Sequence, residues 1–209
     1  MFALIDDQQI TKFFSGNKGV TIGDVQYPKS IFTLWSEAER NAIGIYEVTV
    51  DTTNKKDEQW YINTNVSYGV ESNKAVGSYG TATAKAHADS TYTNQDKTDV
   101  LIPDGKDVGD IKDRGLKYNL IQTVKKQAAG ILQETDWYIT RKADAGTAVP
   151  SSITTHRAAV RTKAAEQETA ITNAADAPAL ETLYTYVNTG TEENPVIERP
   201  LGELPTLDN

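Results

Sequence analysis

The side chains that come closest to a catalytic or metal site surround the first of the two histidines. His87 and Asp89 are two residues apart in a stretch of strand-forming residues, and alternate residues of a strand lie on one face. A histidine beside a carboxylate can act as a general base or as one arm of a metal site. Such pairs are more often polar residues on the solvent face of a strand, and His156 has no acid three or four residues further on. We therefore expect no catalytic residue and no enzymatic activity.

A run of aspartates is the second arrangement that suggests chemistry. Asp104, Asp107, Asp110 and Asp113 recur every three residues, among glycines. Carboxylates bind calcium, but an EF-hand loop spaces its ligands more closely and closes with a glutamate. The overlapping segment 103–106 holds one glycine, without the spaced glycines and the Lys-Ser/Thr pair of a phosphate-binding loop. We expect a turn here, with no metal and no cofactor.

Charge and composition exclude several further classes of function. The chain has 29 acidic and 21 basic residues and a formal net charge of −8, so it should repel a phosphate backbone, and no nucleic-acid partner is expected. It has no cysteine, which excludes disulfides and thiolate metal sites and suits a reducing cytosol. Its first residues, 1–7, carry no basic run and only a short apolar one, so we expect neither a signal peptide nor a membrane association.

Aromatic residues are the strongest candidates for a binding surface. Ten tyrosines and three tryptophans exceed what the lean core of this chain requires. Tyrosine and tryptophan offer large contact areas and are enriched in interface hot spots, although about half of these rings are expected to pack internally. The predicted partner-binding residues, all in the N-terminal half, are Trp60, Tyr61, Tyr68, Tyr79 and Tyr92.

These residues are predicted to lie on a β-rich domain that spans residues 1–102. Thr, Val, Ile and Tyr are frequent there, turns recur about every ten residues, and the pattern is typical of an antiparallel β-sandwich-like domain. Asp6–Gln8 should form a hairpin turn, and Ser36 with Glu39 should form a capping box. Residues 74–88 alternate without large apolar side chains, which predicts a strand that packs at an edge or against another chain.

The hydrophobic period changes after a predicted linker at residues 103–112. Residues 113–190 are predicted to form an α-helical oligomerisation domain of about three helices, which makes the whole chain α+β. Gly130 costs about 1 kcal/mol relative to alanine inside a helix, so a close contact or a bend is expected there. Residues 191–209 should form an extended or disordered acidic tail. The stripe predicted to mediate oligomerisation comprises Leu116, Leu120, Val124 and Ile131.

Three segments of the helical region occur in a fixed order: Asp136–Ala143 (DWYITRKA), Gly146–Pro150 (GTAVP) and His156–Arg161 (HRAAVR). Together they resemble the bacteriophage tail-fibre assembly chaperones, over roughly residues 116–184. The resemblance implies a helical C-terminal domain for self-association and a β-rich N-terminal domain that contacts the partner. Within this frame, we expect Trp137 to be buried between the first two helices, so that Trp137→Ala would cost about 3–5 kcal/mol.

The same resemblance implies a partner and a cellular setting. The partner would be the phage tail fibre protein, whose distal part the chain would help to fold and trimerise without ATP. A fibre is a trimer, so a homotrimer is the natural stoichiometry. The chaperone would act in the host bacterial cytoplasm during virion assembly. The alternative is a structural virion protein of the tail, fibre or baseplate, which would remain associated with the virion.

Overall fold

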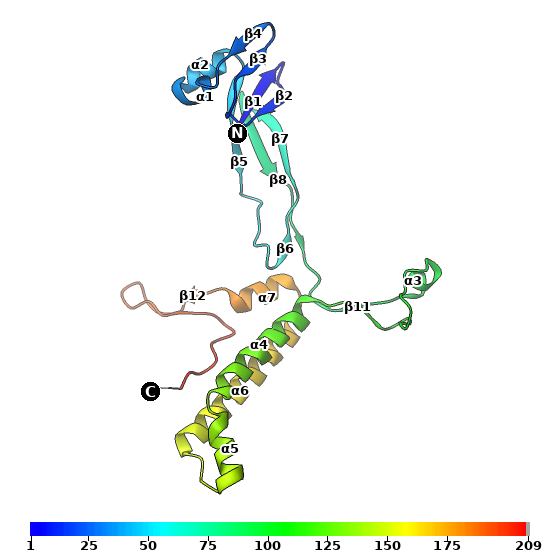
Figure 1. The fold of residues 1–209 in the computed structure, drawn as a ribbon, viewed down its shortest axis with the longest axis vertical. Helices are drawn as coiled ribbons and strands as arrows, with labels where there is room; N and C mark the ends of the chain where they lie inside the picture. Colours follow the sequence, from blue (N-terminus) through cyan, green and yellow to red (C-terminus); the bar gives the residue numbers. More distant parts are fainter. Residues whose placement is uncertain (208–209) are drawn as a thin grey trace. The chain divides into compact units, whose positions relative to one another are not determined.

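Strands fill the first part of the chain and helices most of the rest, so the predicted α+β class is confirmed (Figure 1). The computed structural model describes residues 1–207. The chain divides into two compact units, Met1–Thr83 and Ala84–Asn209. The division falls ahead of the boundary at residue 102 expected from the sequence, and the predicted linker 103–112 belongs to the second unit.

A curled five-stranded sheet forms the centre of the first unit, with strand order β2-β1-β5-β8-β7. The expected antiparallel sandwich needs correction, because β5 and β8 pair in parallel and these strands form one mixed sheet. The strands of the sheet are β1 (Phe2–Asp6), β2 (Gln9–Phe14), β5 (Ile45–Asp51), β7 (Val66–Glu71) and β8 (Lys74–Tyr79). The remaining elements are β3 (Val20–Ile22), β4 (Val25–Tyr27), α1 (Ile31–Leu34), α2 (Glu37–Ala42), β6 (Tyr61–Ile62) and β9 (Thr83–Ala84), which spans the boundary.

Two tight turns set the register of the outer hairpins. Asp7 and Gln8 between β1 and β2, and Ser72 and Asn73 between β7 and β8, have positive φ angles of 46°, 61°, 49° and 58°. Paired residues of this kind match the twist of a two-residue hairpin. Gln8 Nε2 donates a hydrogen bond of 2.7 Å to Asn73 Oδ1, so the curl of the sheet brings the two tips together.

The hydrophobic core of this unit lies on one face of the sheet. Phe14 and Ile45 point from the sheet towards Phe32 of α1, and the ring centroids of Phe14 and Phe32 are 6.2 Å apart. The predicted capping box at the start of α2 is confirmed, since Ser36 N donates to Glu39 Oε2 (2.7 Å) and Glu39 N donates to Ser36 Oγ (3.3 Å). The buried core comprises Phe14, Val20, Ile31, Phe32 and Ile45.

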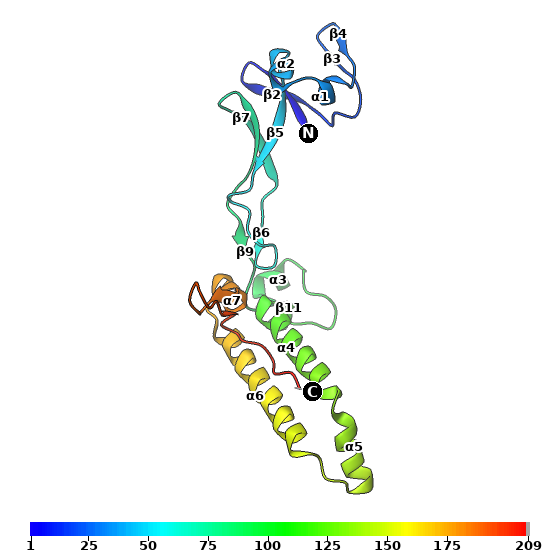
Figure 2. The same cartoon turned by 90° about the vertical axis from the view of Figure 1, so that its left-hand side faces the viewer.

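Two long helices pack side by side in the second unit, as both views show (Figures 1 and 2). The pairing is antiparallel, because Lys117 near the start of α4 donates to Thr172 O near the end of α6 (2.8 Å), while Arg157 near the start of α6 donates to Leu132 O near the end of α4 (2.6 Å). The helices are α3 (Asn94–Thr98), α4 (Leu116–Gln133), α5 (Asp136–Ala145), α6 (Ser151–Asn173) and α7 (Ala177–Tyr184), and the strands are β10 (Ser90–Thr91), β11 (Ile111–Asp113), β12 (Val187–Asn188) and β13 (Ile197–Glu198).

The C-terminal segment is extended and packs on these helices. Leu201 is buried, and its N–H donates to Leu183 O (3.0 Å) just before the end of α7. Gln167 of α6 is also buried and donates to Gly202 O (2.9 Å). No helix within residues 1–207 has the length and apolar character to cross a bilayer.

Candidate partner-binding and self-association surfaces

The five predicted partner-binding aromatics do not form one surface. Tyr92 belongs to the second unit, and the other four belong to the first. Trp60 is 3% exposed, so its ring lies in the interior. A lysine ammonium lies over each half-buried ring: Lys56 over Tyr61, Lys55 over Tyr79 and Lys112 over Tyr92, at 5.8–5.9 Å from the ring centroids. Only Tyr68, at 42% exposure, presents a large part of its ring to a partner.

Tyr68 has a second exposed ring beside it, which we call the aromatic seam: Phe13 and Tyr68. Phe13 is 43% exposed, and the two ring centroids are 5.0 Å apart at an interplanar angle of 62°. Phe13 comes from β2 and Tyr68 from β7, the two outer strands of the sheet. The seam therefore joins the two edges of the curled sheet through side chains.

Small residues of the sheet make room for the seam. Tyr68 pairs with Gly77 of β8, and a Cβ at Gly77 would lie 2.8 Å from Tyr68 Cε1. Ala3 and Ala75, which share the face of Phe13 and Tyr68 through the strand register, are fully buried. The small-residue strand predicted from the sequence is thus covered at Gly77 by the Tyr68 ring of the neighbouring strand β7.

Sequence reasoning missed Phe13, although a signal for it exists. Phe13 and Phe14 are consecutive, and consecutive residues of a strand face opposite sides. Phe14 is buried in the core. Phe13 must then lie on the other face. Only the curl of the sheet, which joins residues far apart in sequence, shows that this face meets Tyr68.

The outer strands also offer backbone groups. β2 and β7 each pair with one neighbour in the sheet, so the groups on their outer sides are not used by its ladders. Such edges are templates for a further strand, and pockets beside them select its side chains. The seam together with the two edges is the best candidate for a partner-binding site in the first unit.

The predicted oligomerisation stripe is partly used inside the chain. Val124 is 2% exposed and packs in the α4–α6 pair, whereas Leu116, Leu120 and Ile131 are half-buried. The last three side chains keep apolar surface available to another copy. Gly130, where a close contact or bend was expected, lies inside continuous α4, and a Cβ there would meet nothing within 4 Å.

The expected burial of Trp137 is wrong, because its side chain is 57% exposed. Its ring lies under the Arg141 guanidinium, whose central carbon is 4.6 Å from the ring centroid. Arg157 occupies the junction instead: it donates to Leu132 O (2.6 Å) and Thr135 Oγ1 (2.7 Å), and it pairs with Asp136 Oδ1 (2.8 Å). Arg157 is 7% exposed, so one guanidinium joins the end of α4, the start of α5 and α6.

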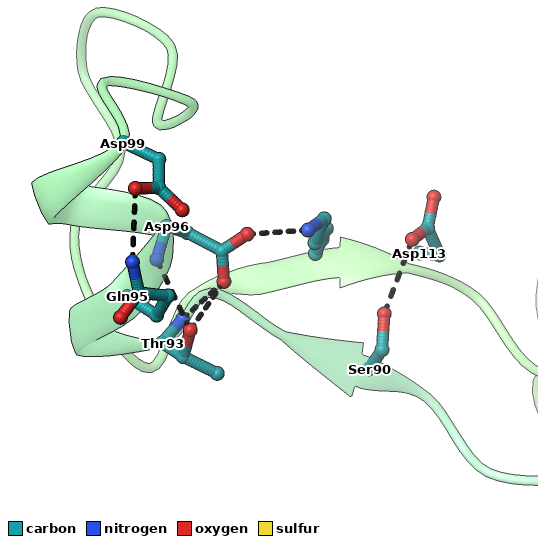
Figure 3. Close-up of polar contacts among 7 residues, drawn as sticks. Ser90, Thr93, Gln95, Asp96, Asp99 and Asp113 are labelled. Carbon is teal, nitrogen blue, oxygen red and sulfur yellow. Dashed lines mark hydrogen bonds and ion pairs between the residues drawn. The ribbon is translucent and has the colours of Figure 1, made fainter.

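Aspartate side chains stabilise the segment between β10 and β11, which contains α3 (Figure 3). Asp96 Oδ2 accepts hydrogen bonds from Thr93 N (2.8 Å) and Thr93 Oγ1 (2.6 Å), and Asp96 Oδ1 pairs with Lys112. The hydrogen bond from Lys112, followed by those from Thr93, holds the pKa of Asp96 far below its ordinary value. On the adjoining ladder, Ser90 Oγ donates to Asp113 Oδ2 (3.2 Å). The aspartates of this region therefore stabilise loop structure.

Asp89 likewise stabilises the backbone through a hydrogen bond. It accepts from Gly115 N (2.8 Å) and pairs with Arg114 (2.6 Å), contacts that lower its pKa in that order. Among residues 1–207, no hydrogen bond joins Asp89 to His87, and no group of three histidine or carboxylate side chains is placed to hold a metal.

The segment between β10 and β11, which contains α3, is expected to lose stability in acid. The pKa of Asp96 in the folded state lies below the ordinary 3.8, so its stabilising contribution is present above pH 3.8 and is lost as the pH falls through the folded-state pKa. The protection of the α3 amides against hydrogen exchange, taken relative to the intrinsic exchange rate at each pH, should therefore fall as the pH drops below 3.8. Asp96→Asn should show fast exchange at neutral pH, while Asp104→Asn should behave as the parent. Protection of the α3 amides in the parent that stays constant as the pH falls would contradict this role.

Comparison with protein-family models, curated proteins and solved structures finds no match to this chain.

Proposed function

We propose that the chain is a bacteriophage tail-fibre assembly chaperone that binds the distal part of the fibre subunits and promotes their folding and trimerisation without ATP. The observation that carries the proposal is the exposed aromatic seam, where the two outer strands of the curled sheet meet. The resemblance over residues 116–184 supplies the identity of the partner. The action would take place in the host bacterial cytoplasm.

The aromatic seam suits the binding of fibre subunits that have not yet trimerised. Lone subunits of an intertwined trimer expose strand edges, which aggregate or pair wrongly before three chains meet. A chaperone edge can pair with such a strand through the backbone, while Phe13 and Tyr68 add contact area. The energy of binding suffices to hold the partner, so no nucleotide is required.

The helical unit would determine how many copies of the chain associate. Leu116, Leu120 and Ile131 keep apolar surface outside the α4–α6 pair and would join copies into a homotrimer. Three linked chaperones would hold three fibre subunits at a high effective concentration. The first unit would then carry recognition of the fibre, and the second would carry assembly.

Removing the seam is expected to weaken fibre binding. The double variant Phe13→Ser with Tyr68→Ser, co-expressed as the full chain with the fibre subunit, should bind it about tenfold or more weakly, the scale of losing a hot spot. The matched control is Leu34→Ser, which changes an apolar side chain that is 80% exposed in the same unit but lies outside the seam. Co-purification and the yield of soluble fibre measure the effect.

Equal binding by the double variant and the parent would place recognition elsewhere. Mass spectrometry of purified particles separates the chaperone from the virion-protein alternative. A chaperone is absent or substoichiometric in the particle, whereas a structural subunit of the tail, fibre or baseplate is present at a fixed ratio.

A further inference from the structure

An aromatic and cationic surface covers one side of α5, and we call it the α5 patch: Trp137, Tyr138, Arg141 and Lys142. These residues follow one another around less than half of the helix circumference. The Arg141 guanidinium lies over the rings of Trp137 and Tyr138, with its central carbon 4.6 and 5.5 Å from their centroids. No residue of α5 is buried, and Trp137 is 57% exposed, so the helix presents much of this surface to solvent.

The positive charge of the α5 patch has no counter-ion among the described residues. Among residues 1–207, no carboxylate forms an ion pair with Arg141 or Lys142. Arg141 Nε is moreover shielded from solvent and has no hydrogen-bond partner. Tryptophan, tyrosine and arginine are the residue types most enriched in interface hot spots. This combination favours a partner with apolar side chains next to carboxylates.

The chain itself contains a surface of that composition, which we call the acidic hairpin: residues 187–198. Val187, Val196 and Ile197 are 43%, 51% and 61% exposed. Glu192 and Glu193, at its tip, are exposed, and neither forms an ion pair within residues 1–207. The hairpin therefore offers exposed apolar side chains and free carboxylates, the complement of the α5 patch.

One copy cannot bring its own two surfaces together without unpacking. The α5 patch precedes the N-terminal end of α6, whereas the acidic hairpin follows α7, beyond the C-terminal end of α6. The 23 residues of α6 span about 34 Å. Contacts of Leu201 with Leu183 and of Gln167 with Gly202 fix the segment that follows the hairpin. Both views show the hairpin apart from α5 (Figures 1 and 2).

We propose that the α5 patch of one copy binds the acidic hairpin of a second copy. The interface pairs two different surfaces, so repetition closes a ring when the rotation between copies permits it, and a homotrimer is one such ring. The inference rests on the self-association within the proposed function, and it names the contact. It does not depend on the fibre, so its test is separate from the test of fibre binding.

Engineered cysteines test the contact directly, because the natural chain has none. Full-length Lys142→Cys and Glu193→Cys proteins are mixed and treated with a short bis-maleimide reagent. The mixture should give a cross-linked dimer several-fold more abundantly than either variant alone. The control mixes Lys142→Cys with Val100→Cys, a position that is 86% exposed in the same unit and lies outside both surfaces. Equal yields in test and control mixtures would overturn the proposal.

Charge reversal supplies an independent measurement. Arg141→Glu with Lys142→Glu should weaken self-association by about tenfold or more, as should Glu192→Lys with Glu193→Lys. The quadruple variant should regain association, since the charges are complementary again. Light scattering coupled to size exclusion gives the mass, and circular dichroism checks that each variant stays helical. A parent that is monomeric at its highest soluble concentration, or a quadruple variant no better than the doubles, would refute the contact.

Discussion

Replacing Arg157 with alanine is expected to lower the free energy of unfolding of the helical unit by about 3 kcal/mol. The guanidinium is 7% exposed and donates to Leu132 O (2.6 Å) and to Thr135 Oγ1 (2.7 Å), and Thr135 is itself 2% exposed. Without Arg157, these acceptors lose a charged donor in a place that water reaches poorly. Asp136 is largely exposed and regains water, so its ion pair adds little to the cost. Thermal and denaturant unfolding followed by circular dichroism measures the loss.

Arg161 is the matched control, because it lies one turn further along the same helix. Its side chain is exposed, and its hydrogen bond is a long one of 3.4 Å to Arg157 O. Arg161→Ala should therefore change stability by less than about 0.5 kcal/mol. If both alanine variants unfold alike, Arg157 is not the anchor of the α4–α5–α6 junction. The comparison matters because the sequence presents both arginines in one segment and does not distinguish them.

Gly115→Ala is expected to destabilise the second unit by about 3 kcal/mol, at the upper end for overpacking a tight site. A Cβ on Gly115 would overlap the carbonyl carbon and oxygen of Ala88 and would lie 2.8 Å from His87 O. The contact is tight because Leu116 N donates to Ala86 O and Lys117 N donates to His87 O, each at 3.0 Å. These carbonyls satisfy the first amides of α4, so the added methyl group must break the cap of the helix.

Gly130→Ala, on the same helix, is expected to stabilise the protein, whereas Gly115→Ala destabilises it. Nothing lies within 4 Å of a Cβ there, and alanine in a helix interior is more favourable than glycine by about 1 kcal/mol. The substitution should raise the melting temperature, while Gly115→Ala lowers it. Two glycine-to-alanine changes with the same sign would show that the cap at Gly115 does not limit the stability of α4.

Several features followed from local sequence alone. The hairpin at Asp6–Gln8 and the capping box of Ser36 with Glu39 depend on residues within three or four positions of one another, so their chemistry is complete in the sequence. The change from strands to helices is equally local, because it depends on the period of apolar residues. These are the parts of the architecture that the sequence determined.

Tertiary structure decided which side chains are exposed on the surface. Arg157 occupies the junction, whereas Trp137, twenty residues before it, is exposed, and no local pattern predicts which of the two is buried. Phe13 meets Tyr68 only because the sheet curls, with β5 and β8 in parallel. The exposure of a side chain depends on which side chains, near or distant in sequence, pack into the interior. That is a property of packing among all the elements. The sequence determined which residues were available for binding, and the fold decided which of them face a partner.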